Sequence, residues 1–359
     1  MIIKQLSPEE FTDIYNNYMI NDFPASELKP LERILYTMSI GLCCSFGLYH
    51  CNELKGYCVF IIPHGSNYCL LDYLAILKGN RGFGFGHQFF QCLKSFFNDA
   101  FPALKGIFIE CESIDSASNP EEHTLRTRRI SFYERNGCTK TKLSSCVFNV
   151  DYVILYYSLY GENLNDGFKD LNFIYKKMFK PHHYKNNVRL CTRLDEAALS
   201  MSAKKLAPFL IGKLLCRKTD DGILKYRITE TECYCGEEDT ACHAHKGMTE
   251  RTKTLYEKGG TSYVYLCYGI HNLFNVVSGT AGHPEAVLIR GVEGYNGPGK
   301  LTRALLIDRS LNGIDMTSSD LLWLEDDGTR VKYRRDKRVG IDYATPKYRD
   351  ILWRFIAVN

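Results

Sequence analysis

The chain has 359 residues, of which 45% are hydrophobic and 24% are charged, and its net charge at pH 7 is +4. This length can support two domains with separate cores, and so weak a charge neither indicates nor excludes nucleic acid as a partner. No apolar run approaches the length of a membrane span and no signal-peptide pattern opens the chain, so we expect neither a membrane protein nor a secreted one.

The cysteines indicate a reducing compartment. There are fifteen of them, scattered, odd in number and without a Cys-x-x-Cys pair, which predicts free thiols and a cytoplasmic protein, associated with the nucleoid if the source is prokaryotic. Cys233, Cys235, Cys242 and His243 lie close together in the sequence. Their spacing lacks the two matched pairs of a zinc site, so we expect no metal there.

The first part of the chain predicts a strand, a glycine-rich turn and a helix. Residues 68–77 are mostly apolar, and residues 87–99 carry phenylalanines and a leucine at helical spacing. Backbone N–H groups of such a turn, together with the helix N-terminus, can hold a phosphate. Gly82, Gly84 and Gly86 are spaced wrongly for a dinucleotide-binding fingerprint, and an ordinary structural turn is the alternative.

A second strand and helix follow. Residues 107–112 predict the strand, and residues 124–137 predict a helix that ends at a glycine. The motifs Arg81-x-x-Gly84-x-Gly86 and Phe132-Tyr-Glu-Arg-Asn-Gly137 resemble those of the GNAT superfamily of N-acetyltransferases. The resemblance covers roughly residues 1–158 and implies an α/β acyltransferase fold with acetyl-CoA as cofactor.

The same resemblance implies roles for individual residues. Tyr133 would protonate the departing thiolate, and Glu110 or Glu112 would deprotonate an amine acceptor. Alternation along a strand puts both glutamates on one face, so the choice between them stays open. Nothing in the sequence identifies the acceptor. The acetyl-CoA pyrophosphate would bind to the amides of the glycine-rich turn, at Arg81, Gly82, Gly84 and Gly86.

Residues 159–192 predict a helical linker. Apolar residues recur at helical spacing up to Phe179, Pro181 is expected to break the helix, and a polar hinge follows. His182 and His183 are adjacent, but without nearby carboxylates or cysteines they indicate surface histidines and not a metal site.

Residues 227–243 predict a strand with an unusual polar face. Glu230, Glu232 and Tyr234 would share one side of it, where a half-buried strand normally carries apolar residues. At least one of these carboxylates is therefore expected to be either solvated or functional. A solvated strand face is the plain alternative, since charged residues mostly lie at protein surfaces.

Residues 261–277 predict a β-hairpin. Two runs rich in aromatic and β-branched residues flank a Gly-Ile-His-Asn turn. Tyr263, Tyr265 and Cys267 would share one face, and Tyr268 would lie on the opposite face beside the turn. This arrangement suits a protein that inserts one aromatic ring into a base stack and receives the displaced base on other rings.

Residues 193–359 resemble the alkyladenine (3-methyladenine) DNA glycosylase family. The resemblance rests on motifs in a fixed order. They are Pro-Phe-Leu-Ile-Gly-Lys-Leu-Leu (208–215), Glu-Thr-Glu-Cys-Tyr-Cys-Gly-Glu-Glu-Asp with His243, Tyr-Val-Tyr-Leu-Cys-Tyr-Gly (263–269), Asn275, Val-Leu-Ile-Arg (287–290), Gly-Pro-Gly-Lys-Leu (297–301) and Arg338-Val-Gly. The resemblance implies an α+β fold with a protruding β-hairpin, and double-stranded DNA carrying damaged purines as the partner.

Two residues would carry the chemistry under this resemblance. Glu232 would be the general base that activates the attacking water, and Arg290 would help to hold that water and a nearby phosphate. A carboxylate suits the step because it both deprotonates water and stabilises an oxocarbenium-like sugar. A cationic lesion needs little acid assistance, whereas a neutral one needs a proton on the departing ring, for which the sequence names no donor. Since no lysine replaces Glu232, a monofunctional enzyme without a cofactor is implied.

The remaining implied roles concern the flipped base. Tyr234, His243 and Tyr265 would form the pocket, where electron-rich rings attract a cationic base. Asn275 would crowd the exocyclic amino group of unmodified guanine, and Tyr268 would fill the gap left in the duplex. Buried tyrosines and histidines are also common as plain core residues, which is the alternative for each.

Three stretches depart from the family pattern or leave it open. Ile270 and His271 stand where a methionine and an aromatic residue are expected, and residues 248–258 align poorly. Residues 330–338 form a basic run with one tyrosine, which suits either backbone phosphates or a solvated loop.

We therefore expect a two-domain chain with a helical linker, in which residues 1–158 are GNAT-like and residues 193–359 are glycosylase-like. The expected function is hydrolytic release of alkylated or deaminated purines, fused to an acetyl-CoA-dependent N-acetyltransferase. One alternative is an acetyltransferase whose C-terminal domain only binds DNA. Another is a module that recognises distorted DNA without cutting it. Glu232, Tyr268 and Asn275 together argue against that last alternative, because pure binding requires no base.

Overall fold

A computed structural model describes residues 2–25, 27–164 and 166–358. The chain divides into two compact units, Met1–Leu190 and Cys191–Asn359, which are described separately below. Within the described ranges, none of the helices combines the length and the apolar character needed to cross a membrane. Nor do the described residues contain a cluster of three or more potential metal ligands.

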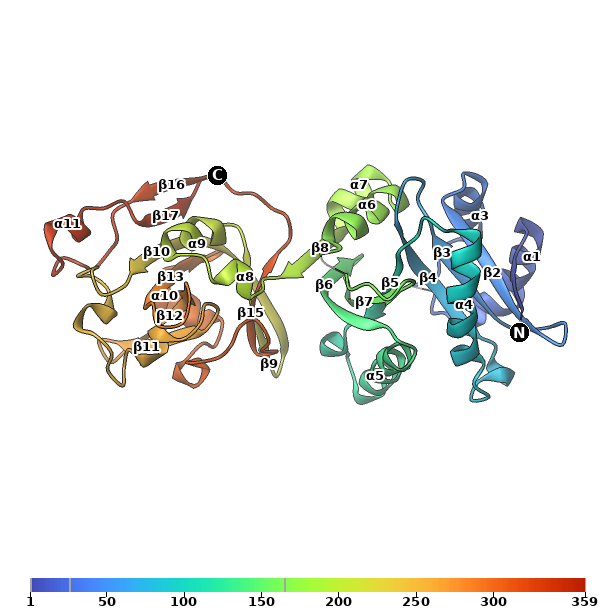
Figure 1. The fold of residues 1–359 in the computed structure, drawn as a ribbon, viewed down its shortest axis with the longest axis horizontal. Helices are drawn as coiled ribbons and strands as arrows, with labels where there is room; N and C mark the ends of the chain where they lie inside the picture. Colours follow the sequence, from blue (N-terminus) through green and yellow to red (C-terminus); the bar gives the residue numbers. More distant parts are fainter. Residues whose placement is uncertain (1, 26, 165, 359) are drawn as a thin grey trace. The chain divides into compact units, whose positions relative to one another are not determined.

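One mixed sheet forms the centre of the first unit (Figure 1). Its strands lie in the order β1 (Ile2–Gln5), β2 (Cys43–His50), β3 (Glu53–Ile61), β4 (Tyr68–Ile76), β5 (Gly106–Glu112), β7 (Val150–Ser158) and β6 (Thr139–Val147). Neighbouring strands are antiparallel, except that β4 and β5 are parallel. Their pairing runs only from Tyr68 with Gly106 to Leu71 with Ile109. Beyond that point β4 and β5 separate, which leaves a gap in the sheet between their carboxyl ends.

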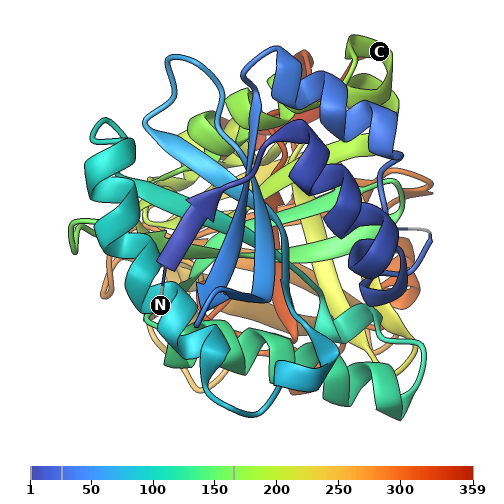
Figure 2. The same ribbon diagram turned by 90° about the vertical axis from the view of Figure 1, so that its right-hand side faces the viewer.

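Helices cover both faces of this sheet. In Figure 2, α4 (Phe85–Ala100) lies on one side of the N-terminal strands, and α1 (Pro8–Ile14) and α3 (Leu31–Ser39) lie on the other. The helix α5 (Pro120–Arg135) begins at Pro120 after Asn119, whose side chain accepts a hydrogen bond from an amide of the first turn. The shorter helical segments are η1 (Tyr15–Met19), α2 (Ile20–Asp22), η2 (Lys78–Asn80) and η3 (Ile114–Ser116).

Strand alternation explains why this sheet has two cores. Leu70 and Phe108 belong to the core beneath α1 and α3, while their neighbours Leu71 and Ile109 belong to the core beneath α4. The central strands β4 and β5 therefore bury both faces, and the predicted strands and helices of this region are all present with ends shifted by a few residues.

The segment expected to link the two domains packs mostly with the first unit. The helix α6 (Phe168–Met178) buries Leu171, Ile174 and Tyr175 in the same core as β4. Pro181 begins a further helix, α7 (Pro181–Asn187), because proline is tolerated in the first helical turn. The contacts thus divide the chain at Leu190, whereas the sequence predicted a separate linker over residues 159–192. The physical reason is the apolar face of α6, which the sheet buries.

The second unit is built around a long strand, β10 (Gly222–Cys235) (Figure 1). Its first half pairs with β9 (Leu214–Thr219), and β9 pairs in turn with β15 (Leu322–Asp326). Its second half lies between β13 (Glu285–Val292) and β17 (Arg354–Ala357). Beyond these strands the sheet continues through β12 (His271–Ser278) and β11 (Ser262–Cys267) on one side and β16 (Tyr333–Asp336) on the other.

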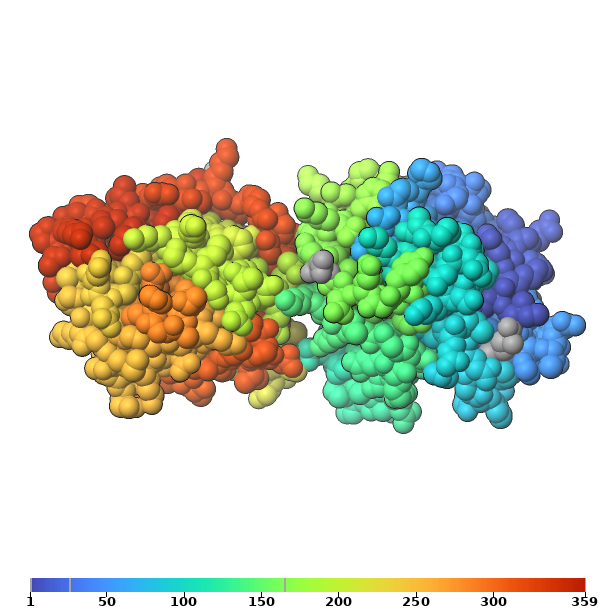
Figure 3. Space-filling view, viewed as in Figure 1, coloured from blue at the N-terminus to red at the C-terminus, as the bar shows by residue number. Residues whose placement is uncertain are grey.

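Two short strands and several short helices complete this unit. The strands are β8 (Val188–Arg193), which leads into the unit, and β14 (Tyr295–Asn296). The helical segments are α8 (Glu196–Leu199), α9 (Ala203–Leu210), η4 (His243–Lys246), η5 (Lys253–Tyr256), α10 (Pro298–Ala304), η6 (Arg309–Leu311) and α11 (Pro346–Arg349). The apolar face of α9 packs into the main core with Ile228, Phe274 and Leu301. In the space-filling view of Figure 3, the segments from η4 to β11 and the C-terminal strands form much of the visible surface of this unit.

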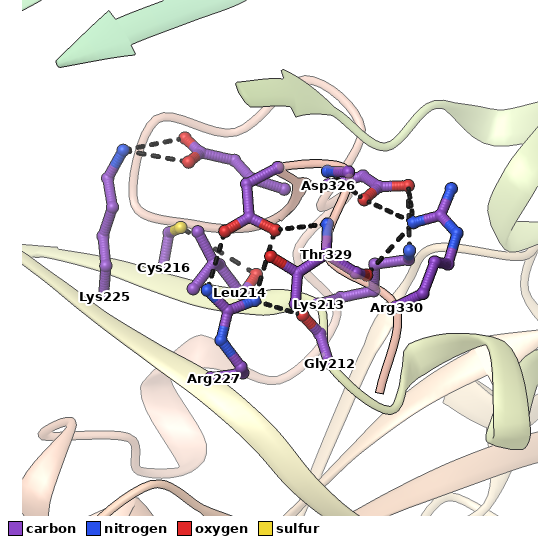
Figure 4. A network of polar contacts seen from close by, with 12 residues as sticks. Gly212, Lys213, Leu214, Cys216, Lys225, Arg227, Asp326, Thr329 and Arg330 are labelled. Atoms are coloured by element: carbon purple, nitrogen blue, oxygen red, sulfur yellow. Dashed lines mark hydrogen bonds and ion pairs between the residues drawn. The ribbon is translucent and has the colours of Figure 1, made fainter. Parts of the chain in front are cut away.

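Three ion pairs fasten the end of β15 and the residue after it to β10 and to Lys213, which directly precedes β9 (Figure 4). Lys213, whose side chain is only 2% exposed, lies 2.8 Å from Asp326. Arg227 pairs with Asp327 at 2.7 Å, and Lys225 pairs with Glu325 at 2.9 Å. The acidic end of β15 is thereby neutralised by three cations from the neighbouring strand pair, which is how charges become tolerable at this depth.

Candidate functional site

A cavity of about 400 Å³ opens in the second unit, between the hairpin of β11 and β12, the segment from η4 to η5, and the chain after β16. Five tyrosines and one histidine line it together with apolar side chains, and Arg251, Arg290 and Asn275 add polar groups. The residues that matter below are Tyr234, His243, Arg251, Tyr263, Tyr265, Tyr268, Asn275, Arg290, Val339 and Tyr343. The four expected pocket residues, Tyr234, His243, Tyr265 and Asn275, therefore converge here, and the expected wedge Tyr268 lines the same cavity.

Glu232 lies directly behind this wall and is fully buried. One carboxylate oxygen accepts a hydrogen bond from the Val339 amide at 2.9 Å, and the other accepts one from the Tyr234 hydroxyl at 2.9 Å. Burial raises the pKa of Glu232, while the Arg290 guanidinium and these two hydrogen bonds lower it; burial outweighs them. All three partners line the cavity, so the carboxylate is held at its edge by the groups that form its surface.

Arg290 connects the two glutamates of β10. Its Nε lies 2.9 Å from Glu230 and 3.5 Å from Glu232. Glu230 also accepts a hydrogen bond from Arg354 at 2.6 Å. The strand has a bulge beside Glu230, yet both carboxylates still face Arg290, in agreement with the alternation expected from the sequence. Glu230 is thus committed to two arginines, whereas Glu232 is the carboxylate that adjoins the cavity.

His243 lies among tyrosines on the far wall. Its Nδ1 is 3.1 Å from the Tyr263 hydroxyl, and its ring meets the Tyr265 ring edge to face at 4.5 Å. Burial and the Arg251 guanidinium lower the pKa of His243 to about 4, so the imidazole is neutral near pH 7. Asn275 is buried on β12, where its side-chain amide donates to the Tyr263 carbonyl oxygen at 3.1 Å. These contacts fix the imidazole and the amide in place before any ligand binds.

Tyr234 is held from behind by a buried arginine. The Arg338 guanidinium lies 4.7 Å from the centre of the Tyr234 ring and forms a two-point ion pair with Asp239, with contacts of 2.6 and 2.9 Å. It also donates to the Cys233 carbonyl oxygen at 3.0 Å. Arg338 therefore ties the end of β10 to the segment that carries Val339, and so supports both hydrogen-bond partners of Glu232.

Tyr268 stands at the mouth of the cavity in the turn between β11 and β12. Its side chain is 90% exposed, and its backbone φ of 50° lies in the left-handed region, next to Gly269 at 74°. Tyr343 lines the mouth as well, with its hydroxyl donating to the Ala241 carbonyl oxygen at 3.1 Å. An exposed aromatic ring at a tight turn adds nothing to a core, which agrees with the expected role of a wedge.

Sequence reasoning did not single out Arg251, Tyr263, Val339 or Tyr343 as functional residues. Tyr263 had a usable signal, because alternation places it beside Tyr265. Val339 and Tyr343 lie in a segment without regular structure, about 100 residues after Glu232, and no local pattern predicts that it closes the cavity. Arg251 lies in the stretch that aligned poorly.

The basic run at residues 330–338 is largely paired within the protein. Arg330 lies 3.1 Å from Asp326, Arg334 lies 2.8 Å from Asp336, and Lys337 lies 2.8 Å from Asp350. These pairs reduce the positive charge that the run presents to a phosphate backbone, and they favour the solvated-loop interpretation.

In the first unit, the glycine-rich turn precedes α4 as expected. Gly82 and Gly84 have φ of 86° and 78°, a backbone conformation that glycine adopts without strain. The helix starts after Gly84 without a side-chain cap, so the amides of its first turn are available to a ligand. The Arg81 side chain itself is bonded to Asp22 at 2.8 Å and to the Ile76 carbonyl oxygen at 2.9 Å.

The structure distinguishes the two glutamates of β5. Glu112 is paired with Arg126 at 3.0 Å and with Arg129 at 2.9 Å. Glu110 accepts hydrogen bonds from the hydroxyls of Tyr175 at 2.5 Å and Ser145 at 3.3 Å. Burial raises the pKa of Glu110. Glu112 is therefore committed to two arginines, whereas Glu110, near the point where β4 and β5 separate, has no cationic partner among the described residues.

Tyr133 lies away from these glutamates. It is buried in the core beneath α4, with its ring edge to face with Phe90 at 5.7 Å and near Phe132 at 5.3 Å, and burial raises its pKa. Glu110 instead contacts Tyr175 of the opposite core. The structure thus does not bring Tyr133 and Glu110 together on one face of the sheet.

Comparison with known proteins assigns the second unit. A family model for methylpurine-DNA glycosylases matches residues 197–296 and 293–359. A protein of Psychrobacter cryohalolentis named for 3-methyladenine DNA glycosylase activity is 46% identical over 169 residues, covering 39% of this chain and 80% of that protein. A protein of the same name from Natranaerobius thermophilus is 42% identical over 187 residues, covering 45% of this chain and 94% of that protein.

Solved structures similar to this chain include acetyltransferases. One is assigned to the GNAT family in Bacteroides thetaiotaomicron, with 20% identity and a TM-score of 0.39, covering 51% of this chain and 98% of that one. Another is an aminoglycoside 6'-N-acetyltransferase complexed with coenzyme A, with 14% identity and a TM-score of 0.34, covering 46% of this chain and 100% of that one.

Proposed function

The chain belongs to the methylpurine-DNA glycosylase family, and from this premise we propose that its second unit releases damaged purines from duplex DNA. The reaction is hydrolysis of the bond between the purine and C1′ of deoxyribose. The observation that carries the proposal is the position of Glu232, a buried carboxylate whose three polar partners all line an aromatic cavity.

Glu232 acts as the general base in this proposal. A water molecule at the cavity edge gives its proton to the carboxylate while its oxygen bonds to C1′, and the purine departs with the electrons of the broken bond. The raised pKa of Glu232 makes it a stronger base than an exposed glutamate. Arg290, 3.5 Å from Glu232, holds the carboxylate and the water in position and contacts the adjacent phosphate.

The cavity receives the flipped base. Tyr234 and Tyr265 contact its faces or edges, and the neutral imidazole of His243 forms a hydrogen bond with it. Asn275 is fixed by the Tyr263 carbonyl oxygen and cannot turn away from the amino group of an unmodified guanine, which it excludes by contact. Tyr268, exposed at the hairpin tip, occupies the space that the base leaves.

No cofactor takes part in this hydrolysis, and the product is an uncut abasic site. A glycosylase that also cuts the strand attacks C1′ with an amine, whereas the group at the chemical position here is a carboxylate. Because its substrate is genomic DNA, such an enzyme works in the cytoplasm beside the chromosome, where thiols stay reduced. All fifteen cysteines are free in the structure.

The decisive experiment compares two glutamates on the same strand. Duplexes with a single 3-methyladenine, hypoxanthine or ethenoadenine are incubated with the protein, and the freed base is measured by mass spectrometry. Glu232→Gln should still bind the duplex and lose base release by at least about 100-fold. Glu230→Gln is the matched control, because Glu230 is held by two arginines and does not adjoin the cavity. If Glu232→Gln releases base as fast as the wild type, the general base is misassigned.

A second activity is proposed for the first unit, namely transfer of an acetyl group from acetyl-CoA to an amine. Two observations favour it: the uncapped glycine turn at residues 81–86, and the gap that opens between β4 and β5 after Leu71 and Ile109. Backbone amides at the turn hold the pyrophosphate, and Glu110 takes the proton from the acceptor amine. Tyr133 has no part in this step, because it is buried in the core on the other face of the sheet.

The test is consumption of acetyl-CoA with a panel of amines. Free coenzyme A is measured by chromatography, because exposed and half-buried thiols such as Cys51 would react with a thiol reagent. Glu110→Gln should abolish turnover while Glu112→Gln retains part of it, and Tyr133→Phe should leave thiolate release unchanged. Turnover that survives Glu110→Gln would remove that residue from the mechanism.

The alternative is an acetyltransferase whose C-terminal unit only delivers it to DNA. Under that alternative the protein binds damaged duplexes and consumes acetyl-CoA but frees no base. The joint presence of Glu232, Asn275 and Tyr268 at one cavity favours catalysis, because a binding module has no use for a buried carboxylate there.

A further inference from the structure

One arginine at the cavity has no counter-ion. Arg338 is neutralised by Asp239 at 2.6 Å, and Arg290 and Arg354 together are neutralised by Glu230 and Glu232. Among the residues that the structure describes, no carboxylate lies within ion-pair distance of Arg251, although it lines the same cavity. With Glu232 ionised, the cavity therefore carries the positive charge of Arg251 in excess.

Arg251 is placed against the base-binding rings. It lies just before η5, and its guanidinium carbon is 5.5 Å from the centre of the Tyr265 ring. The Tyr265 ring in turn contacts His243 edge to face. Burial lowers the pKa of His243 and raises that of Tyr263, and the charge of Arg251 adds to the first effect and opposes the second, as expected for a cation that faces both rings. The side chain is exposed to solvent, so it stands at the mouth of the cavity.

The chemistry of the departing base makes this charge consequential. When the bond between C1′ and the purine nitrogen breaks, both electrons stay with the purine. A cationic base such as 3-methyladenine leaves as a neutral molecule, whereas hypoxanthine or ethenoadenine leaves as an anion unless it takes up a proton. A nearby cation stabilises the anion and repels the cation, and both effects grow once the bound base excludes water.

The described groups of the cavity offer no strong acid to supply that proton. His243 is neutral near pH 7, since burial and Arg251 hold its pKa at about 4. Burial raises the pKa values of Tyr265 and Tyr234, which makes both hydroxyls weaker acids. Arginine keeps its charge throughout the working range, so it can stabilise the leaving group without giving up a proton.

We propose that Arg251 is a specificity-determining residue, which favours release of neutral purine lesions over cationic ones by stabilising the negative charge on the departing base. This inference rests on the proposed glycosylase function and assigns it a substrate class. The aromatic rings alone would attract a cationic base, whereas the positive charge of Arg251 repels a cationic base and attracts an anionic one.

The test measures single-turnover release of four bases by the full-length protein at saturating enzyme. The duplexes carry hypoxanthine or ethenoadenine as neutral lesions, and 3-methyladenine or 7-methylguanine as cationic lesions. Arg251→Gln should slow release of both neutral bases at least tenfold and leave release of the cationic bases unchanged or faster. Arg251→Lys, which keeps the charge, should restore most of the neutral-base rate.

Lys253→Gln is the matched control. Lys253 lies two residues away in η5, is exposed and does not line the cavity, so it reports the loss of one positive charge beside the DNA. For Lys253→Gln, the ratio of the release rates of neutral and cationic bases should equal that of the wild type. Because Arg251 and Lys253 are both exposed, neither substitution should lower the melting temperature.

Two outcomes would overturn the proposal. Equal slowing of all four bases by Arg251→Gln, with weaker duplex binding, would make Arg251 a phosphate contact. If Arg251→Gln changes neither the release rates nor the ratio of neutral to cationic release, Arg251 has no part in the reaction. If the wild type frees no base at all, the glycosylase function itself fails, which is a different result from a glycosylase whose base preference ignores Arg251.

Discussion

In the proposed reaction, Glu232 serves the chemistry at a cost to stability. Its carboxylate is fully buried and receives two hydrogen bonds, yet the desolvation of its charge still outweighs them and raises its pKa. A group with that property is a better base and a worse core residue. The trade-off between stability and activity should therefore be measurable at this position.

Glu232→Gln should stabilise the protein above neutral pH by about 1 kcal/mol, because the amide avoids burying a charge. The folded-state pKa of Glu232 is raised, so the carboxylate is protonated in the folded state at low pH and carries no penalty there. The gain over the wild type should consequently shrink as the pH falls through that raised pKa. Calorimetry at pH 8 and pH 5 checks this, and a variant less stable than the wild type at pH 8 would contradict it.

The same raised pKa predicts the acid limb of the reaction. Release of a cationic base requires ionised Glu232 but does not require protonation of the leaving group. Its rate should therefore fall as the pH is lowered, with a midpoint above the ordinary pKa of glutamate, about 4.3. Single-turnover rates for 7-methylguanine between pH 4 and pH 8 provide the measurement. A rate that stays flat across this range would mean that no titrating base is involved.

At the scale of elements, the hairpin of β11 and β12 has six paired residues on each strand. It supplies both a wall of the cavity and the exposed ring at its turn. Alternation sends Tyr263 and Tyr265 to the cavity, and the left-handed turn presents Tyr268 to solvent. This much follows from local pattern, since side-chain alternation and turn composition are properties of neighbouring residues.

Tyr268→Ala should leave the melting temperature within about 1 °C of the wild type, because an exposed side chain contributes little to folding. It should slow base release from duplex DNA by at least tenfold, since the vacated space in the stack is no longer filled. Release from a duplex in which the lesion faces an unpaired gap should suffer less. Equal loss on both substrates would argue against a wedge.

The other informative element is β15, whose acidic end is clamped by cations of β9 and β10 (Figure 4). Asp326→Asn should destabilise the protein by about 3 kcal/mol, because it leaves the buried Lys213 charge without its counter-ion. Urea denaturation measures the loss. Asp350→Asn, which removes an exposed partner of Lys337, is the control and should cost under about 1 kcal/mol.

At the scale of the whole molecule, the chain has two compact units, each with its own core. Separate cores predict separate unfolding transitions in a calorimetric scan. Acetyl-CoA, if it binds at the turn of residues 81–86, should raise the temperature of only one of these transitions. The free energy of unfolding of that unit should increase by about 3 kcal/mol at 100 times the dissociation constant. An oligonucleotide with a lesion should raise only the other, and a shift of both by one ligand would show that the units are coupled.

How much of this could be predicted from sequence depends on whether the signal was local. The strands around Glu232 and Tyr265, the hairpin turn and the glycine turn before α4 follow from periodicity and turn residues, and the structure contains them. The packing of the segment expected to be a linker could not be predicted from such local signals. The apolar face of α6 was visible in the sequence, but the sheet that buries it lies about 100 residues earlier in the chain.

The sequence by itself determined the family of the C-terminal unit and the residue types of its cavity, because ordered motifs and alternation are carried by neighbours along the chain. The tertiary structure decided that Glu232 is buried, that Val339 and Tyr343 line the adjacent cavity, and that Arg251 lines it too with no carboxylate in ion-pair distance among the described residues. These properties depend on segments far apart in the chain meeting in space. Burial and charge balance are sums over such neighbours, and no local pattern contains them.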